Sequence, residues 1–395
     1  MNEMGSTSAR RVYFDHNATT YTRREVVEKM LPFFAERFGN ASSVHFFGEE
    51  AQEAIEEARE NVASLIGAEP EEILFTSGGT ESDNLAIRGV VKALRTEGVA
   101  PHVITSKIEH PAVIRTCQAL EKEGVEVTYV GVLKDGTVDL EELEGAIRPN
   151  TLLVSIMLAN NETGVIQPIE KISRMAAERG ITMHVDGVQG VGKIPVNVDD
   201  LGVDLLSVSA HKFYGPKGIG ALYIRRGTRM DPIYTGGGHE RGIRPGTENV
   251  PGIVGFGEAA RITARELDGE MEQIGSLRNR LEQGIKSRVD AIVINGEEAK
   301  RVPNTSSVVV KGIEGEAMTL AMSLEGFAIS SGSACSSGSG DPSHVLLAMG
   351  VDPKYAQGGI RISLGIINTE ADIDGFLDVF PGVVERLRSM SPIAE

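Results

Sequence analysis

The sequence has little cysteine and no long apolar segment. Only two of its 395 residues are cysteines, Cys117 and Cys335, and they form neither a Cys-x-x-Cys motif nor a cluster with histidines. This scarcity argues against a disulfide framework and against a zinc site. No stretch approaches the unbroken apolar length that a helix needs to cross a bilayer.

Positive charge is also scarce. The chain carries 39 Lys and Arg against 56 Asp and Glu, a formal net charge of −17. This balance argues against a nucleic acid or an anionic membrane as partner. The first residues, MNEMGSTSARR, contain arginines but no apolar stretch after them, so they do not resemble a secretory signal. We therefore expect a cytoplasmic protein.

A length of 395 residues is more than one hydrophobic core usually serves, and it predicts two domains. Strand and helix patterns alternate up to about residue 226, which predicts a mainly parallel sheet covered by helices. The expected strands are 72–75, 102–106, 125–130, 151–157, 182–185 and 205–209, and the expected helices are 47–66, 80–95, 111–122 and 168–179.

From about residue 251 the pattern changes to a long helical stretch that reaches residue 289. We expect a smaller α+β domain in this part of the chain. The predicted division gives a large domain of residues 16–260 and a small domain of residues 1–15 and 261–395. The expected strands of the small domain are 291–295, 307–311, 328–330 and 360–364, and its expected helices are 316–323 and 373–389.

Three segments place reactive residues at the ends of predicted strands. Asp186 follows one apolar strand pattern, and Lys212 follows the next and precedes a loop rich in Gly and Pro. Gly79 and Thr80 lie between a strand and a helix, where backbone N–H groups and the helix dipole can bind a phosphate. Together these features suggest pyridoxal phosphate, which needs a Schiff-base lysine, a carboxylate for its ring nitrogen and donors for its phosphate.

Each of these features alone has an ordinary structural explanation. A Gly-Gly turn before a helix is often only a turn, an aspartate at a strand end is often a cap, and lysines are common on surfaces. Their shared place at the carboxyl ends of strands favours the functional interpretation, because α/β sheets bind ligands there. Ser209, His211 and the Thr80 hydroxyl could add phosphate donors.

Eight segments in consistent order extend over nearly the whole chain: HNATT, TSGGTESDN, EH at 109 and 110, NNETG, HVDGVQ, SAHKFYGPKG, GGGHERGIRPGTENV and SSGSACSS. Together they resemble the class V aminotransferase superfamily and, more narrowly, the cysteine desulfurases of the nitrogen-fixation and iron–sulfur-cluster type. The resemblance implies an α/β protein with fold type I of the pyridoxal-phosphate-dependent transferases: a large domain with a mainly parallel sheet, and a smaller α+β domain.

The resemblance also implies a role for each matching position. Lys212 would form the Schiff base, Asp186 would pair with the pyridine nitrogen, and Gln189 would donate to the ring oxygen. His110 would stack on the ring and act as an acid/base group. The remaining positions would hold the phosphate: Gly79, Thr80, Ser209, His211 and, from the other subunit of an implied homodimer, Thr247.

Arg361 and Asn161 bear on the substrate. Arg361 lies inside an apolar strand pattern, where an unpaired guanidinium is costly. It is either a clamp on an α-carboxylate, which the resemblance favours, or a partner in a structural ion pair. Asn161 would bind the ring oxygen or the substrate, or it would form an Asx-turn. From the residues alone, His110 is equally well a helix-entry histidine, and Gln189 a solvated polar residue.

The two cysteines lie in different settings. Cys117 is within a helix pattern and fits a buried apolar residue, whereas Cys335 lies in the small-residue stretch 330–340, where packing gives it no purpose. The resemblance makes Cys335 the nucleophile that takes sulfur from L-cysteine as a persulfide, for an acceptor such as an iron–sulfur cluster scaffold. No metal site is expected, apart from a transient cluster that Cys335 could share with a partner. The alternatives are a selenocysteine lyase, a related aminotransferase and a non-catalytic scaffold.

Overall fold

The computed structural model describes residues 11–332 and 342–391. Its main element is a seven-stranded sheet in the order β2-β8-β7-β6-β5-β3-β4. Neighbouring strands from β4 to β7 run parallel, and β8 is antiparallel to both β7 and β2. The strands are β2 Ile73–Thr76, β3 His102–Ser106, β4 Glu126–Val130, β5 Thr151–Met157, β6 Thr182–Asp186, β7 Leu205–Ser209 and β8 Gly220–Ile224. The predicted, mainly parallel sheet is confirmed.

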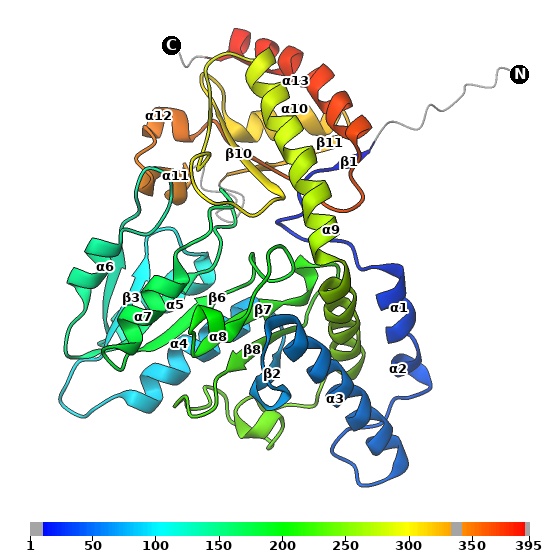
Figure 1. Cartoon of the computed structure of the whole chain (residues 1–395), viewed down its shortest axis with the longest axis vertical. Coiled ribbons are helices and arrows are strands. Elements are labelled where there is room, and N and C mark those ends of the chain that lie inside the picture. The colour runs from blue at the N-terminus through cyan, green and yellow to red at the C-terminus, as the bar shows by residue number, and fades with distance from the viewer. Residues whose placement is uncertain (1–10, 333–341, 392–395) are drawn as a thin grey trace, which may run out of the picture.

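Helices cover both faces of this sheet (Figure 1). The helices of this part are α1 Arg24–Met30, α2 Pro32–Ala35, α3 Phe46–Ile66, α4 Gly79–Leu94, α5 Pro111–Lys122, α6 Leu140–Ala146, α7 Ile169–Ala177 and α8 Val198–Leu201. Three short 3-10 turns accompany them: η1 Pro70–Glu72, η2 Ala210–Lys212 and η3 Glu240–Gly242. The predicted helix from 47 ends as expected, since Gly67 caps α3 with φ 68°.

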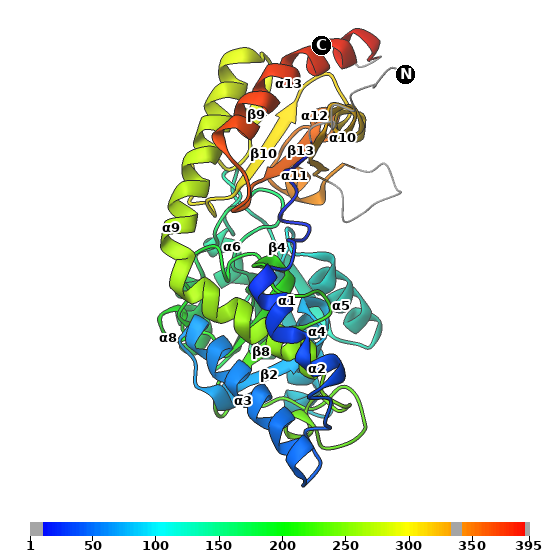
Figure 2. The ribbon, with the colours of Figure 1, turned by 90° about the vertical axis from the view of Figure 1, so that its right-hand side faces the viewer.

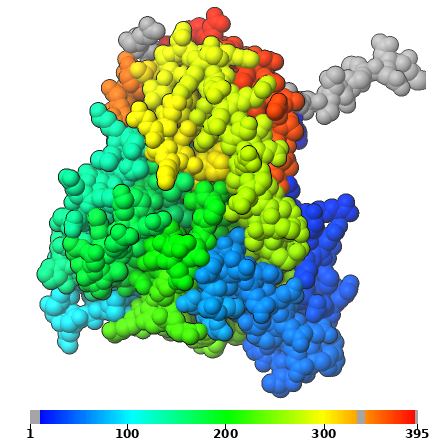
Figure 3. Space-filling view, viewed as in Figure 1, coloured from blue at the N-terminus to red at the C-terminus, as the bar shows by residue number. Residues whose placement is uncertain are grey.

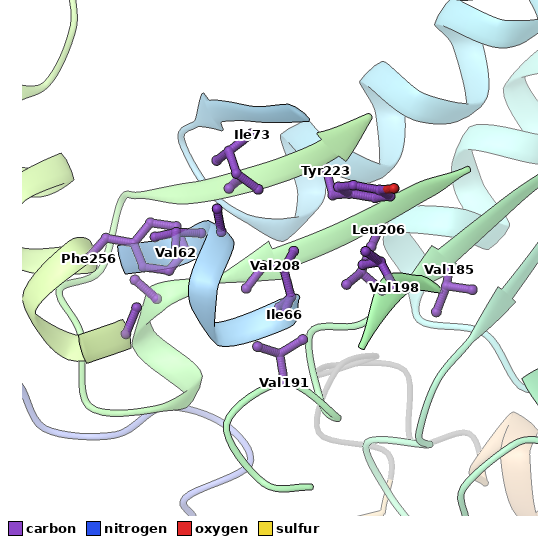
Figure 4. Close-up of a cluster of buried hydrophobic side chains, with 14 of the residues drawn as sticks. Val62, Ile66, Ile73, Val185, Val191, Val198, Leu206, Val208, Tyr223 and Phe256 are labelled. Atoms are coloured by element: carbon purple, nitrogen blue, oxygen red, sulfur yellow. The ribbon is translucent and has the colours of Figure 1, made fainter. Parts of the chain in front are cut away.

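Alternate strand residues point to opposite faces of the sheet, and each face has its own core. Leu205 packs with residues of α4 and α5, including Cys117, which is fully buried as predicted. Leu206 and Val208 face the other way and pack with α3, α7 and α9 (Figure 4). Both faces are therefore apolar, which explains why β7 is buried at every position.

The C-terminal part of the chain forms a separate sheet with its own helices. The long helix α9 Val250–Arg288 runs from the large sheet to this part (Figures 1 and 2). This part contains a four-stranded antiparallel sheet in the order β12-β13-β10-β9, and a parallel pair of β1 with β11. Its elements are β1 Val12–Tyr13, β9 Ile292–Ile294, β10 Thr305–Val310, α10 Gly315–Leu324, β11 Phe327–Ala328, β12 Ser330–Ser331, α11 His344–Ala348, α12 Pro353–Ala356, β13 Gly359–Ser363 and α13 Glu370–Met390.

One expected strand is wrong. The pattern at 328–330 does not form a single strand: β11 pairs with β1, and β12 pairs with β13 in a different sheet. The side chain of Ile329, between them, is buried in the hydrophobic cluster of the C-terminal part of the chain. The run therefore changes sheets at this residue, and an apolar pattern alone does not show such a change of partner.

Besides the cluster between the large sheet and helices α4 and α5, the buried hydrophobic side chains form two larger clusters. The first extends from Val26 to Ile262, and the second joins Val12 and Phe14 to residues between Ile274 and Val384. These clusters support the predicted division near residue 260, which stays a prediction. In Figure 3 the yellow to red C-terminal part lies above the green and blue remainder. Within the described ranges, no helix has the length and apolar character to span a membrane.

Candidate active site

A cavity of about 330 Å³ opens at the carboxyl ends of β5, β6 and β7, where Met157, Asp186 and Ser209 line it. Residues from the second sheet and from the N-terminal segment complete its wall. The following sequence-predicted residues all line this one cavity: Gly79, Thr80, His110, Asn161, Asp186, Gln189, Ser209, His211, Lys212 and Arg361.

Two predicted residues are not among them. Thr247 is exposed, lies in the loop before α9 and does not line the cavity of its own chain. The same loop contacts the start of α4, because Arg244 Nε donates to Glu81 Oε1 at 3.0 Å. Cys335 lies outside the described residues.

Lys212 extends from η2, directly after β7. Its Nζ donates to the backbone oxygens of Asn17 at 2.6 Å and of Ala18 at 2.8 Å. Both acceptors are backbone oxygens without formal charge, so neither contact is an ion pair. The geometry keeps a lysine amine inside a cavity at a strand end, as the Schiff-base assignment requires.

Asp186 is the last residue of β6, and its side chain is buried. Its Oδ1 accepts a hydrogen bond from the Val188 N–H at 3.0 Å, so it also makes the local contact typical of a capping aspartate. Burial raises the pKa of Asp186, while the positive charges of His110 and Lys212 act in the opposite direction. Such a carboxylate is well placed to pair with a buried cation.

The first turn of α4 lies beside a second hollow that adjoins the cavity. Gly78 precedes this helix with φ 148°, a conformation that other residues rarely adopt. The free N–H groups of the helix start and its dipole favour an anion here. Four of the predicted residues line this hollow: Gly79, Thr80, Ser209 and His211. Lys217 lines it as well and was not predicted from the sequence.

His110 caps helix α5, as a helix-entry histidine does, and it also lines the cavity, so its catalytic role stays a prediction. Its Nδ1 accepts the Ala112 N–H at 3.1 Å, which places the proton of the neutral ring on Nε2. Burial lowers the pKa of His110, the nearby charge of Lys212 lowers it further, and Asp186 opposes both effects.

Arg361 lies on β13 and is only 4% exposed. Its Nη2 pairs with Asp15 Oδ1 at 2.7 Å, and its Nη1 donates to the Asn161 backbone oxygen at 3.0 Å. The ion-pair interpretation is therefore correct for the protein without ligand. Its Nε is buried and has no partner among the described residues, so donor capacity remains for a substrate.

Asn161 and Gln189 do not take their alternative roles. The Asx-turn belongs to Asn160, whose Oδ1 accepts the Glu162 and Thr163 N–H groups, both at 2.9 Å. Gln189 is buried rather than solvated, and its Nε2 donates to the Asn17 backbone oxygen at 3.0 Å.

Several residues of the site were missed by sequence reasoning. Asp15, Asn17 and Ala18 come from the N-terminal segment, next to or within the HNATT motif that signalled the family. Asp83 lines the cavity from α4, and its buried Oδ1 has no hydrogen-bond partner among the described residues, although His184 Nε2 lies 3.7 Å from it. Burial and the charge of Asp186 raise the pKa of Asp83 well above its usual value.

A family model described as aminotransferase class-V matches residues 12–376. The chain belongs to this family. It is 51% identical to the cysteine desulfurase IscS of Dictyoglomus turgidum over 383 residues, which are 97% of either chain. A solved NifS-like protein is similar with a TM-score of 0.89 and 43% identity, over 95% of this chain and 100% of that one. A structure of SspA in complex with cysteine is similar at 38% identity and a TM-score of 0.80, over 91% and 100% of the two chains.

Proposed function

We propose that this member of the class V aminotransferase family is a pyridoxal-phosphate-dependent cysteine desulfurase. It takes sulfur from L-cysteine, leaves L-alanine and carries the sulfur as a persulfide on Cys335. The observation that carries the proposal is that Lys212, Asp186 and Arg361 line one cavity in a chain with 51% identity to a cysteine desulfurase. A selenocysteine lyase remains the alternative, and a comparison of the two substrates separates them.

The residues present fit the cofactor. An amine, a buried carboxylate and a helix start line adjoining hollows, as a Schiff base, a pyridinium and a phosphate require. Two buried polar atoms of the wall, Asp83 Oδ1 and Arg361 Nε, have no hydrogen-bond partner among the described residues. Such groups are costly to leave unpaired, and a polar ligand would satisfy them.

Each predicted residue keeps its proposed role. Lys212 would bind the cofactor covalently, Asp186 would pair with its ring nitrogen, and Gln189 and Asn161 would bind its ring oxygen. The phosphate would be held by Gly79, Thr80, Ser209, His211 and the Thr247 of a second subunit. When bound, pyridoxal phosphate supplies an electron sink for the carbon from which a proton is removed.

The protein's own groups then divide the remaining work. Arg361 would bind the substrate's α-carboxylate, for which it would share or exchange its contact with Asp15. Lys212 would remove and return the α-proton. His110, neutral near pH 7, would hold a proton at Nε2 for exchange with the substrate. The burial that lowers the pKa of His110 favours this neutral form.

Sulfur transfer would end on Cys335. Its thiolate would form an S–S bond with the substrate sulfur as the C–S bond breaks, and the substrate carbon would keep the electron pair and take a proton. An acceptor such as an iron–sulfur cluster scaffold would then receive the sulfur. The test is Cys335→Ser, which should abolish release of alanine and sulfide from cysteine while the visible cofactor spectrum stays unchanged. Normal sulfide production by this variant would refute the assignment.

We also propose a cytoplasmic homodimer. Thr247 is not among the residues that line its own cavity, which is consistent with a residue that serves the partner's site. Large apolar side chains at the tip formed by α2 and the start of α3 are exposed in the single chain: Phe34, Phe38, Val44 and Phe46. Several large apolar side chains exposed within one short segment are typical of an interface. Light scattering on the purified protein should give a mass twice that of the chain, and a monomer would contradict the proposal.

A further inference from the structure

Lys193 is a buried lysine beside the cavity, and the proposed function gives it no role. It is only 4% exposed. Its Nζ donates to Asn17 Oδ1 at 2.7 Å and also to Gln189 Oε1. Both acceptors are neutral amides, and within the described ranges no carboxylate forms an ion pair with this amine. Burial of an ammonium without such a partner is costly, so its presence calls for a functional explanation.

The surroundings of Lys193 are cationic. Burial lowers its pKa well below the ordinary value, and the charges of Lys212 and Arg361 lower it further. His16 is the other titratable neighbour: burial and then the charge of Lys193 lower the pKa of its ring to about 4. Charged or neutral, a lysine amine has at least two N–H donors. Both contacts of Lys193 can therefore be made in either protonation state.

The contact with Gln189 fixes the orientation of an amide. A lysine N–H requires an oxygen acceptor, so Oε1 must face Lys193 and Nε2 must face the other way. Nε2 indeed donates to the Asn17 backbone oxygen at 3.0 Å. The side that Gln189 can offer to a ligand in the cavity is thus its N–H side, as a donor to a ring oxygen requires.

The contact with Asn17 connects Lys193 to the other groups of the site. The Asn17 backbone oxygen accepts the Lys212 Nζ at 2.6 Å. The Asn17 side-chain Nδ2 donates to the Asn161 backbone oxygen at 3.1 Å. That oxygen also accepts a hydrogen bond from Arg361 Nη1 at 3.0 Å. Asn17, which accepts a hydrogen bond from Lys193, thus contacts both the Lys212 amine and the backbone oxygen that binds the Arg361 guanidinium.

Asn17 is also tied to the second sheet. Its Oδ1 accepts Asn304 Nδ2 at 3.0 Å, its Nδ2 donates to Thr305 Oγ1 at 2.8 Å, and its N–H donates to Ser363 Oγ at 2.9 Å. The buried polar atoms of this network satisfy one another, so removal of one donor leaves several groups without a partner.

We propose that Lys193 is a positioning residue for the desulfurase reaction: it orients the Gln189 amide and holds Asn17, and through them it places the ring-binding donor and Lys212. This inference rests on the proposed function. It concerns a residue that touches neither cofactor nor substrate, and that acts through its two amide neighbours.

The test replaces Lys193 with methionine, which has similar length and no donor. The variant should still bind pyridoxal phosphate through Lys212 and show a visible band. The pH midpoint of that band should rise by at least about half a unit, because the Gln189 N–H donor that Lys193 orients favours the unprotonated chromophore. The kcat should fall about tenfold or more, with a smaller change in KM. Lys171→Met, at an exposed site on α7, is the matched control.

A residue with a merely structural role would lower the melting temperature and leave the midpoint and the kcat of the folded protein unchanged; that result would overturn the proposal. If Lys193→Met does not fold, Lys193→Gln should show the same changes at smaller size, and a wild-type midpoint in that variant would likewise overturn it. In the double variant with Gln189→Ala the two shifts should not add, because Lys193 acts through that amide.

The outcome is separate from that of the proposed function. Wild-type protein that binds no pyridoxal phosphate would refute the function. A wild type with cofactor and activity, together with a Lys193→Met variant that titrates like it, would refute only the role of Lys193.

Discussion

The cavity is built from two regions that differ in how the sequence encodes them. The strand ends of the large sheet supply Asp186, the last residue of β6, and Lys212, in the turn that follows β7. The N-terminal segment supplies Asp15 and Asn17, whose contacts are with residues far away in the chain. Strand ends therefore place the reacting groups, whereas long-range hydrogen bonds hold these groups in position.

The loss of a reacting group at a strand end should have the largest effect. Lys212→Ala should abolish the covalent visible chromophore and reduce alanine formation by about 10³-fold or more, because both the Schiff base and the proton-transferring amine are lost. Absorbance spectra and an alanine assay check this. Activity within a few-fold of wild type would show that another amine does the chemistry.

Arg361 joins the two regions, since it lies on β13 and pairs with Asp15. Arg361→Ala should raise KM for cysteine about 10²-fold, since a buried charged hydrogen bond to the substrate carboxylate is lost. Steady-state kinetics measure the effect. An unchanged KM with lower stability would mean that the arginine serves only the ion pair.

Asn17 tests the N-terminal region alone. Asn17→Ala should lower the free energy of unfolding by about 3 kcal/mol. Lys193 and Asn304 lose an acceptor, and the Asn161 backbone oxygen and Thr305 Oγ1 lose a donor. Urea denaturation measures this, with the exposed Asn40→Ala as control, for which we expect less than about 1 kcal/mol. Equal stability of the two variants would contradict the role of this network.

The smallest effect concerns a buried carboxyl next to His110. Burial raises the pKa of Glu109 to about 8. The folded protein thus binds a proton that the unfolded chain releases near pH 4.5, so this group destabilises the fold as pH rises from about 4.5 to about 8. Glu109→Gln should match wild type at pH 5 and exceed it by about 1 kcal/mol or more at pH 8.

Urea denaturation at the two pH values checks this sign, with the exposed Glu97→Gln as control. A stability difference that stays constant between pH 5 and pH 8 would show that Glu109 does not titrate in this range.

The strands and helices around the large sheet could be predicted from the sequence because apolar periodicity is a local signal. The same signal placed Asp186 and Lys212 at strand ends. It failed at Ile329, where the chain changes sheets, and it did not reveal β8, which joins the sheet in the antiparallel direction. Partner and direction of a strand depend on distant residues rather than on its own pattern.

The missed site residues have a related explanation. Lys193 and Asn17 matter through contacts with each other, 176 residues apart in sequence, and Asn17 meets Thr305 across 288 residues. No local pattern distinguishes a buried lysine of this kind from a surface lysine. Arg361 was singled out because its strand is apolar, but its partner Asp15, 346 residues away, could be found only in the fold.

The most direct measurement follows from the presence of two lysines near the cavity: Lys212 lines it, and the buried Lys193 contacts Gln189 of its wall. Borohydride reduction of the protein with pyridoxal phosphate fixes the cofactor to the amine that holds it, and peptide mapping then locates the label. The account predicts the label on Lys212. A label on Lys193, or no label at all, would contradict it.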